Sequence, residues 1–315
     1  MMVSNKSVST FNKIADERAA VTRQLANSLR DEMLHVAGSL ATKQRDLVLE
    51  NTRKCPYRGF VDVSADCFQT FVMFCNNDDP VALQYFWLGA DAWEPTSMRI
   101  WSSLCRNARG AVLDIGSFSG LYSLVANGLC TMPIVAFEPS RMPLVRLIDN
   151  INANGASAIK VVPKAASDHE GITCFHLLRG LMTLSTGGRL EGVGDERLQE
   201  PVFVTTVDLE LEGLNIGTVS HAKIDVEANE VRTLKGMWKM IERDRPELLI
   251  EIIPDLLGEV SGMLGRIGYH CLAIEEEQQV LLRLEDAPRK DRNYLFSARP
   301  ECLNEMASLV RGGLG

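Results

Sequence analysis

Two carboxylates in this sequence stand where chemistry is expected, and the first lies beside a pair of glycines. The segment VLDIGSFSG places Asp114 two positions before Gly116, and Gly120 ends the same loop. Glycines in such a turn let the backbone approach a ligand closely, and the following helix offers free N–H groups. The spacing differs from the GxGxxG of dinucleotide sites, and a carboxylate here would repel a pyrophosphate. We therefore expect a ligand that carries a positively charged amino group.

The second carboxylate, Glu138, follows the apolar run IVAF and precedes Pro139. It comes about 20 residues after Gly116, the offset at which an acidic residue binds ribose hydroxyls in α/β folds. Adjacent parallel strands end at one edge of a sheet, so we expect Glu138 to lie beside the glycine loop. The alternative is a glutamate on the surface.

A third segment, HAKIDVEANE, alternates apolar residues with Lys223, Asp225 and Glu227. In a strand these three side chains share one face. An edge strand would leave them in water, whereas a central strand requires partners, because unpaired buried charge is costly. Glu251, in the apolar run ELLIEII, is the expected cross-strand partner of Lys223. The four residues form either a structural ion network or a catalytic group with Asp225 as its base.

The elements that position these residues follow from the hydrophobic pattern. From Ala111 onward, short apolar runs alternate with helical stretches such as NEVRTLKGMWKMIERD, which predicts βαβ units and a sheet covered on both faces. An insertion over 172–220 is predicted to hold two strands around a loop at 179–200, either a lid or a disordered segment. The predicted strands are AVLDIG, PIVAFE, AIKVVP, ITCFHLLRG, PVFVTTVDLEL, HAKIDVE, ELLIEII, YHCLAIEE and YLFSARP.

The region before Ala111 has a different pattern. Apolar residues at three- and four-residue steps over about 10–53 predict two helices, which either pack on the main body or join two chains in a homodimer. The segment FVDVSADCFQTFVMFC predicts a strand or hairpin, and further helices follow with a break near Gly89. We expect an N-terminal helical segment (1–55), a hairpin and helical lead-in (56–110), the ligand-binding α/β domain (111–300) and a C-terminal tail (301–315).

Composition narrows the class of protein. The chain has 315 residues and a formal net charge of −8, which gives nucleic acid no overall attraction. No run is long enough to span a membrane, and the N-terminus lacks the apolar core of a signal peptide. Eight scattered cysteines without a CxxC pair predict free thiols in a cytoplasmic protein. The sequence has no His/Cys array of the kind that binds a metal, although a divalent ion bridged by Asp225 and Glu227 stays a possible alternative. His169 and His221 are weaker candidates for the active site.

The order of several motifs resembles the FkbM family of class I S-adenosylmethionine-dependent methyltransferases over about residues 89–299. The resemblance implies a Rossmann-like α/β fold with a seven-stranded mixed sheet in the order 3-2-1-4-5-7-6. The chain departs from the usual DIGANIG loop at residues 117–119, and Ala228 replaces the glycine of the usual DVEG. The motifs are GADAWE, LDIGSFSG, VAFEP, KAASDHEG, TTVDLEL, KIDVEANEVRTLKG and RPELLIEII.

The resemblance also implies where the donor S-adenosylmethionine binds. Asp114, Gly116 and Gly120 would border its methionine part and Glu138 its ribose, with Asp168 near the adenine amine. The complete set of expected donor-binding residues is Glu94, Asp114, Gly116, Ser117, Gly120, Glu138, Pro139, Ser167 and Asp168.

The implied activity is O-methylation of a carbohydrate, a glycolipid or a secondary metabolite. A protonated hydroxyl is a weak nucleophile, so a base or a well-oriented acceptor assists the transfer. The catalytic candidates are Asp225, Glu227 and Lys223. Two alternatives are open: a catalytically inactive donor-binding or scaffolding protein, and an NAD-dependent oxidoreductase, which the missing GxGxxG disfavours.

Overall fold

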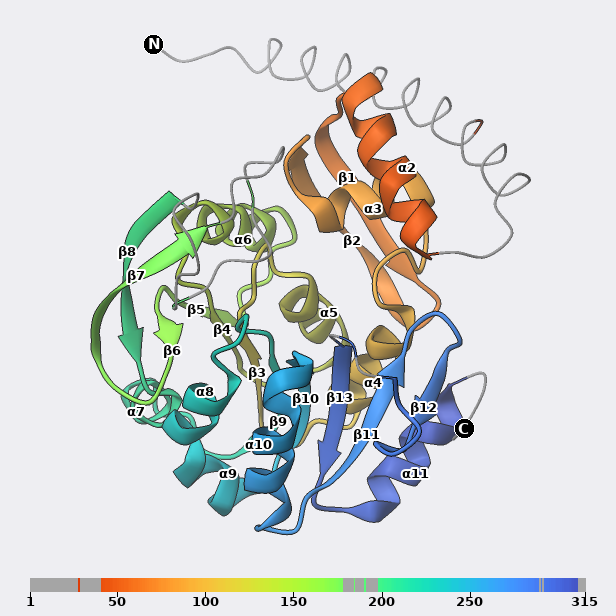
Figure 1. Ribbon diagram of the computed structural model, residues 1–315. Helices are drawn as coiled ribbons and strands as arrows, with labels where there is room; N and C mark the ends of the chain where they lie inside the picture. Colours follow the sequence, from red (N-terminus) through yellow and green to blue (C-terminus); the bar gives the residue numbers. More distant parts are fainter. Residues whose placement is uncertain are drawn as a thin grey trace.

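Figure 1 shows the computed structural model of the chain. A large mixed sheet with helices on both faces forms its centre, and a two-stranded and a three-stranded sheet flank it. The structure describes residues 41–177, 198–288 and 292–310, together with Ser28, Leu184, Leu190 and Lys290.

Eight strands form the central sheet: β3 (Ala111–Ile115), β4 (Ile134–Phe137), β5 (Ile159–Val162), β9 (Val219–Ile224), β10 (Glu247–Ile252), β11 (His270–Glu275), β12 (Val280–Leu282) and β13 (Arg292–Ser297). Their order is β12-β11-β13-β10-β9-β3-β4-β5. The five strands from β10 to β5 pair in parallel, and β13 is antiparallel to both of its neighbours. All five residues of β3 are buried, the pattern of a strand covered by helices on both faces.

The predicted strand order is confirmed, but the predicted number of strands is wrong. Without β12, the observed order is 3-2-1-4-5-7-6. The eighth strand arises because β11 turns back on itself, so that Val280–Leu282 pairs antiparallel with Ala273–Glu275. Three residues at a sheet edge carry too little hydrophobic alternation to be recognised in the sequence.

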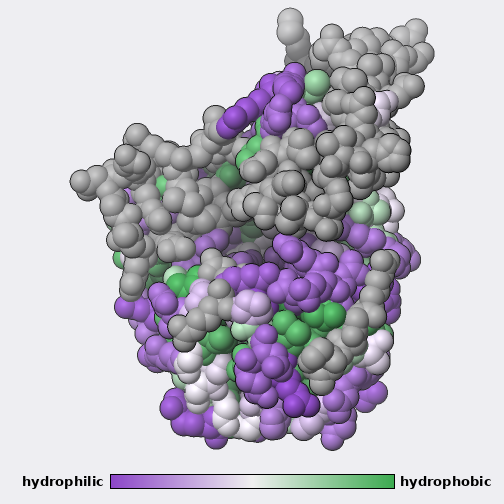
Figure 2. Space-filling model, turned by 45° about the vertical axis from the view of Figure 1, so that its right-hand side comes forward, coloured by the Kyte–Doolittle hydropathy of each residue, from purple (hydrophilic) through white to green (hydrophobic). Residues whose placement is uncertain are grey.

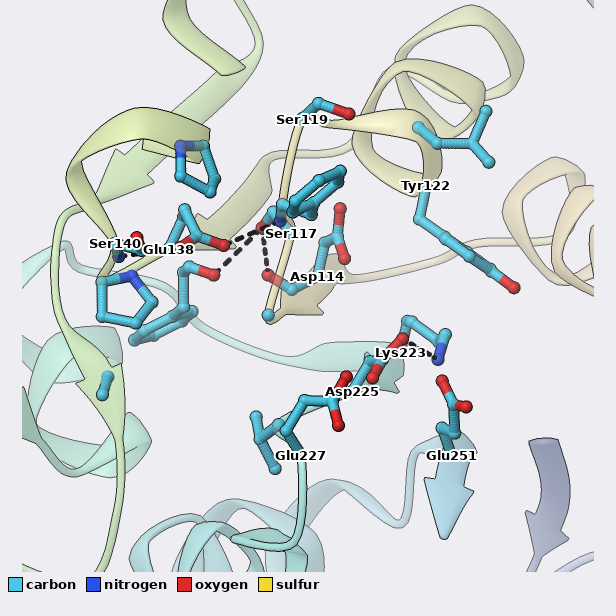
Figure 3. Close-up of a pocket in the computed structure, with 18 of the residues that line it drawn as sticks. Asp114, Ser117, Ser119, Tyr122, Glu138, Ser140, Lys223, Asp225, Glu227 and Glu251 are labelled. Atoms are coloured by element: carbon cyan, nitrogen blue, oxygen red, sulfur yellow. Dashed lines mark hydrogen bonds and ion pairs between the residues drawn. The ribbon is translucent and has the colours of Figure 1, made fainter. Parts of the chain in front are cut away.

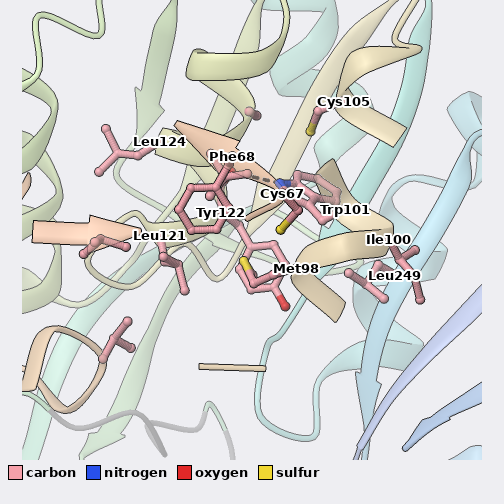
Figure 4. Close-up of a cluster of buried hydrophobic side chains, with 14 of the residues drawn as sticks. Cys67, Phe68, Met98, Ile100, Trp101, Cys105, Leu121, Tyr122, Leu124 and Leu249 are labelled. Carbon is pink, nitrogen blue, oxygen red and sulfur yellow. Dashed lines mark hydrogen bonds between the residues drawn. The ribbon is translucent and has the colours of Figure 1, made fainter. Parts of the chain in front are cut away.

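Helices divide between the two faces of the sheet (Figure 1). One face is covered by α4 (Pro95–Arg106), α5 (Leu121–Leu129), α6 (Arg141–Ala153) and α11 (Pro300–Leu309), and the other by α8 (Glu230–Gly236), α9 (Trp238–Asp244) and α10 (Pro254–Gly265). In the hydrophobic core between the sheet and the first group of helices, Trp101 lies edge-on to Tyr122, with ring centroids 5.5 Å apart (Figure 4). Trp101 Nε1 also donates to the Tyr122 carbonyl oxygen at 3.0 Å. Helix α4 thus fixes the start of α5, which borders the site described below.

The helix expected over residues 229–244 is interrupted. Helix α8 ends at Gly236 and α9 begins at Trp238, with Met237 between them. A Cβ on Gly236 would lie 1.8 Å from the carbonyl oxygen of Ser167. Only glycine permits this approach of α8 to the segment after β5.

The predicted strand or hairpin before the main domain is a hairpin. β1 (Arg58–Ala65) pairs antiparallel with β2 (Phe68–Asn76), and α2 (Ala41–Lys54) and α3 (Pro80–Leu88) pack beside it. Helix α3 ends at Leu88 and is capped by Gly89, which confirms the predicted break near Gly89. Most of the two helices expected over 10–53, and the homodimer hypothesis that depends on them, lies outside the described residues.

Polar side chains of α6 and of its C-cap residue Asn154 bind the free edge of β2. Asn154 accepts from Val72 N at 3.0 Å and donates to Val72 O at 2.7 Å. Asn150 accepts from Phe74 N at 2.7 Å, while Arg146 donates to Phe74 O at 2.7 Å. Buried backbone groups need such partners, so α6 attaches the hairpin to the central domain.

The insertion contains a small sheet and a helix. β6 (Ala165–Ala166) and β7 (Gly171–Leu177) both pair with β8 (Leu198–Thr205), and α7 (Val207–Gly213) follows. The prediction that TTVDLEL continues a strand is wrong, because Thr206 caps a helix there and accepts from Leu209 N at 3.3 Å. Nearly all of the loop expected at 179–200 lies outside the described residues.

All eight cysteines lie in the described residues and are free, as predicted. No helix in the described part of the chain is both long and apolar enough to cross a membrane. On the face drawn in Figure 2, hydrophilic side chains surround small apolar patches, the usual distribution on a protein surface.

Candidate active site

A pocket of about 360 Å³ opens at the carboxyl ends of β3, β4, β9 and β10 (Figure 3). This is the edge at which open α/β sheets bind their ligands, and the volume is in the range of small-molecule sites. Nine of the residues expected in the site line it: Glu94, Asp114, Gly116, Ser117, Glu138, Pro139, Lys223, Asp225 and Glu227.

The glycine loop after β3 touches the segment after β9. Gly116 has φ +86°, and a Cβ there would lie 1.7 Å from the carbonyl oxygen of Asp225. In the other direction, Asp225 N donates to Ile115 O at 2.9 Å. The two loops therefore meet backbone to backbone, and this contact holds Asp225 beside the glycine loop.

Asp114 lies at the floor of the pocket. Its Oδ2 accepts from Ser123 Oγ of α5 at 2.5 Å, and the residue is 1% exposed. Burial raises the pKa of Asp114 to about 6, although the hydrogen bond from Ser123 and the charge of Lys223 oppose this. Asp114 and Lys223 are direct partners in the β3–β9 register, which explains their proximity.

Glu138 joins the loops after β3 and β4. Its Oε2 accepts from Phe118 N and its Oε1 from Ser140 N, each at 2.8 Å. Burial raises the pKa of Glu138 to about 8 against these two hydrogen bonds. Both oxygens keep further lone pairs, so the carboxyl group can still accept from hydroxyl groups of a ligand.

Lys223 is a fully buried cation with several polar neighbours. Its Nζ donates to Asp225 Oδ2 at 3.2 Å and to Asn293 Oδ1 at 3.0 Å, and it lies 5.2 Å from the centre of the Tyr122 ring. Burial lowers the pKa of Lys223, but the carboxylates around it, with Asp225 first, raise it further than burial lowers it. Its pKa consequently lies above the ordinary lysine value. An ammonium group with 1% exposure stays charged because of these partners.

Asp225 is more open than Lys223, with 31% of its side chain exposed. Figure 3 shows Glu251 beside the Lys223 ammonium group, on the side away from Asp225. The charge of Asp225, and then burial, raise the pKa of Glu251 to about 10, so Glu251 carries a proton near neutral pH. In the β9–β10 register Leu249 lies opposite Lys223, and Glu251 is two residues further along β10, on the same face of the sheet.

The alternating charges of HAKIDVEANE do not share one strand face as predicted. β9 ends at Ile224, so only Lys223 lies in the strand, and Asp225 and Glu227 belong to the loop that follows. Glu227 and Ala228 have φ values of +53° and +74°. A backbone in this left-handed region leaves the extended path of the strand, and it suits the glycine that the resemblance gives at position 228 better than Ala228.

Three of the residues expected at the donor do not line the pocket. Gly120, with φ +98°, starts α5, and a Cβ there would lie 2.6 Å from Leu147 Cδ1. Ser167 and Asp168 come just after β6, and the Asp168 carboxylate is 2.8 Å from His169 Nδ1. The wall of the pocket near them consists of Lys164, Ala165 and Ala166.

Two residues were not expected from the sequence: Tyr122 lines the pocket, and Asn293 binds Lys223 from outside the lining. The Tyr122 hydroxyl donates to Glu94 Oε2 at 2.5 Å, and its place in the first turn after the glycine loop is a signal that could have identified it. Asn293 holds Lys223 from β13, and nothing in its local sequence marks it. Its neighbour Glu251, directly opposite in the β10–β13 register, brings it to the site.

The two histidines have different places. His221 is 1% exposed in the core, where its Nε2 lies 3.4 Å from Cys105 Sγ, and burial lowers its pKa to about 3. His169 lies at the surface beside Asp168. Within the described residues, no group of three or more His, Cys, Asp or Glu side chains is arranged to hold a metal ion.

Comparison with known families decides what kind of domain this pocket belongs to. The model of the methyltransferase FkbM domain matches residues 114–286, from the buried carboxylate of β3 to the turn before β13, which is more than half of the chain. The chain belongs to the FkbM methyltransferase family. Its fold is Rossmann-like, and the pocket described above lies inside the matched range except for Trp93, Glu94 and three residues of α3.

Solved structures are similar to parts of this chain. The methyltransferase FkbM from Methylobacillus flagellatus KT is 21% identical over 59% of this chain and 43% of its own, with a TM-score of 0.38. A SAM-dependent methyltransferase from Agrobacterium tumefaciens is 12% identical over 78% of this chain and 71% of its own, with a TM-score of 0.42. The chain thus spans less than half of the Methylobacillus protein. No protein of curated function matches it.

Proposed function

We propose that this FkbM methyltransferase uses S-adenosylmethionine to methylate a hydroxyl group of a carbohydrate, a glycolipid or a secondary metabolite. Family membership supports methyl transfer, and the acceptor class is taken from the resemblance of the sequence. The observation that carries the proposal is the half-exposed carboxylate of Asp225, held beside the glycine loop and against a buried ammonium group.

The residues of the pocket fit the donor. Gly116 has no room for a side chain, so the backbone itself forms the wall there. Glu138, fixed by two backbone N–H groups, would accept from the ribose hydroxyls, with Ser117 and Pro139 beside it. Asp114 would face the amino group of the methionine part. When bound, S-adenosylmethionine supplies a methyl group on a positively charged sulfur.

Asp225 is the proposed general base. Its carboxylate would accept the proton of the acceptor hydroxyl as that oxygen becomes a nucleophile. Lys223 donates to it at 3.2 Å, which holds the carboxylate in one orientation. Glu251 holds a proton nearby, and Glu227 borders the pocket, where it would contact the acceptor.

Two measurements test the function directly. Thermal unfolding with S-adenosylmethionine and with NAD compares the two cofactors, because a ligand that binds only the folded state raises its midpoint. Incubation with cell extracts, followed by mass spectrometry, should detect an acceptor that gains one methyl group together with S-adenosylhomocysteine. Donor binding without any S-adenosylhomocysteine would instead indicate a donor-binding or scaffolding protein.

We also propose that the protein works in a reducing compartment such as the cytoplasm. Eight cysteines, all free, support this placement. Fractionation of the host cells would test it.

A further inference from the structure

The segment that leads into α4 has a strained backbone at the pocket. Glu94 has φ +43° and ψ +56°, and Pro95 is the first residue of the helix. A left-handed conformation is costly for most residues other than glycine. Such strain persists only where surrounding contacts impose it, and it concentrates at functional sites.

Glu94 does not use its own side chain to cap α4, although it occupies the capping position. Its Oε2 instead accepts from the Tyr122 hydroxyl at 2.5 Å. The side chain thus points to the end of the pocket where Lys223 lies, and the charge of Glu94 is among those that raise the lysine pKa. Because the Glu94 side chain is used elsewhere, the free N–H groups at the start of α4 need an acceptor from another residue.

Glu276 supplies that acceptor from the opposite end of the chain. It lies in the turn between β11 and β12, and its Oε2 accepts from Thr96 N at 2.7 Å. Its Oε1 accepts from Ser97 N at 3.1 Å and from Ser97 Oγ at 2.5 Å. One carboxylate therefore satisfies the two backbone groups that a capping side chain normally binds.

We propose that Glu276 is a positioning residue of the active site: by capping α4 from the β11–β12 turn, it releases Glu94 to bind Tyr122 and face the donor pocket. The inference rests on the proposed function, since it treats the pocket as the donor site. It also gives a role to the eighth strand, because the β11–β12 hairpin presents Glu276.

The charges of the two glutamates support their proximity. Burial, and then the charge of Glu94, raise the pKa of Glu276 to about 7, against the hydrogen bonds from Ser97 and Thr96. If Glu276 were removed, the Glu94 carboxylate would be the nearest group able to cap α4. Turning toward the helix would cost its bond to Tyr122.

The test is a double-mutant cycle read out by the affinity for S-adenosylhomocysteine, measured by calorimetry. Glu276→Ala and Glu94→Gln should each weaken binding by about tenfold, the size of one hydrogen bond to a charged group. The double variant should be no weaker than Glu276→Ala alone, because Glu276 acts through Glu94. Glu276→Gln keeps one acceptor oxygen and should fall between wild type and Glu276→Ala.

The matched control is Glu277→Gln, the exposed neighbour in the same turn, which should bind as wild type does. Losses that add in the double variant, or unchanged affinity in Glu276→Ala, would overturn the inference while leaving the proposed function standing. A wild-type protein that does not bind S-adenosylhomocysteine would overturn both.

Discussion

The carbonyl oxygen of Asp225 occupies the space that a side chain on Gly116 would need, at 1.7 Å from an ideal Cβ. Two motifs more than one hundred residues apart in the sequence thus meet through their backbones, with Asp225 N donating to Ile115 O. One of these motifs forms the wall of the donor pocket, and the other carries the proposed base. Their contact therefore sets the distance between the donor pocket and the proposed base Asp225.

Gly116→Ala should therefore disrupt the site. The added methyl group clashes with backbone, and φ +86° strains any residue but glycine. We expect a loss of about 3 kcal/mol in the free energy of unfolding and loss of binding of S-adenosylhomocysteine. Gly128→Ala in α5 is the control, since nothing lies within 4 Å of its Cβ. Equal stabilities of the two variants would contradict the contact.

Asp225→Asn and Asp225→Ala test the proposed base. Each should lower the rate of methyl transfer by about 100-fold or more, because neither side chain can accept the hydroxyl proton. Donor affinity should stay close to wild type, since other residues hold the donor. Asp286→Asn, at an exposed position of the same domain, is the control. Near-full turnover in both Asp225 variants would exclude this carboxylate as the base.

The pKa of Glu138 predicts a pH dependence of stability. Burial raises this pKa from 4.5 to about 8, so the folded state holds the proton more tightly than the unfolded state does. The resulting stabilisation is complete below about pH 4.5 and is lost as the pH rises toward 8. In the ligand-free protein, the free energy of unfolding of Glu138→Gln should fall less over this range than that of wild type. Denaturant titrations at several pH values measure both slopes, and parallel slopes would contradict the prediction.

Asn150 connects three parts of the molecule, and its removal should cost stability. Its amide accepts from Phe74 N and donates to Ser119 O at 2.8 Å in the glycine loop. Asn150→Ala leaves both groups buried without partners, which should lower the free energy of unfolding by about 2–4 kcal/mol. Asn152→Ala, exposed on the same helix, is the control and should change stability by less than about 0.5 kcal/mol. Similar costs in the two variants would show that the β2 contact is unimportant.

Much of this site follows from short stretches of sequence. Asp114 and Glu138 are identifiable because each ends an apolar run, and parallel strands place such ends together. Asn293 and Glu276 are not identifiable in this way. The antiparallel strand β13 brings Asn293 to Lys223, and the turn before the three-residue edge strand β12 brings Glu276 to the start of α4. Asp168 shows the opposite case: its motif marks it, but its carboxylate pairs with His169 outside the pocket. Side-chain direction and long-range pairing are the parts that local pattern does not specify.

Ala228 offers a stabilising change next to the proposed base. Its φ of +74° suits glycine, the residue that the resemblance gives at this position. Relief of left-handed strain is worth roughly 1–2 kcal/mol, and the extra freedom of glycine in the unfolded chain offsets about 0.5–1 kcal/mol of it. Ala228→Gly should thus raise the free energy of unfolding by up to about 1.5 kcal/mol, measured by denaturant titration. Ala222→Gly in β9, fully buried, should instead lower it.

Because Ala228 N donates to Glu230 through its backbone, which glycine retains, turnover of Ala228→Gly should match wild type. A destabilised Ala228→Gly protein would mean that the methyl group of Ala228 contributes more by packing than its backbone loses by strain.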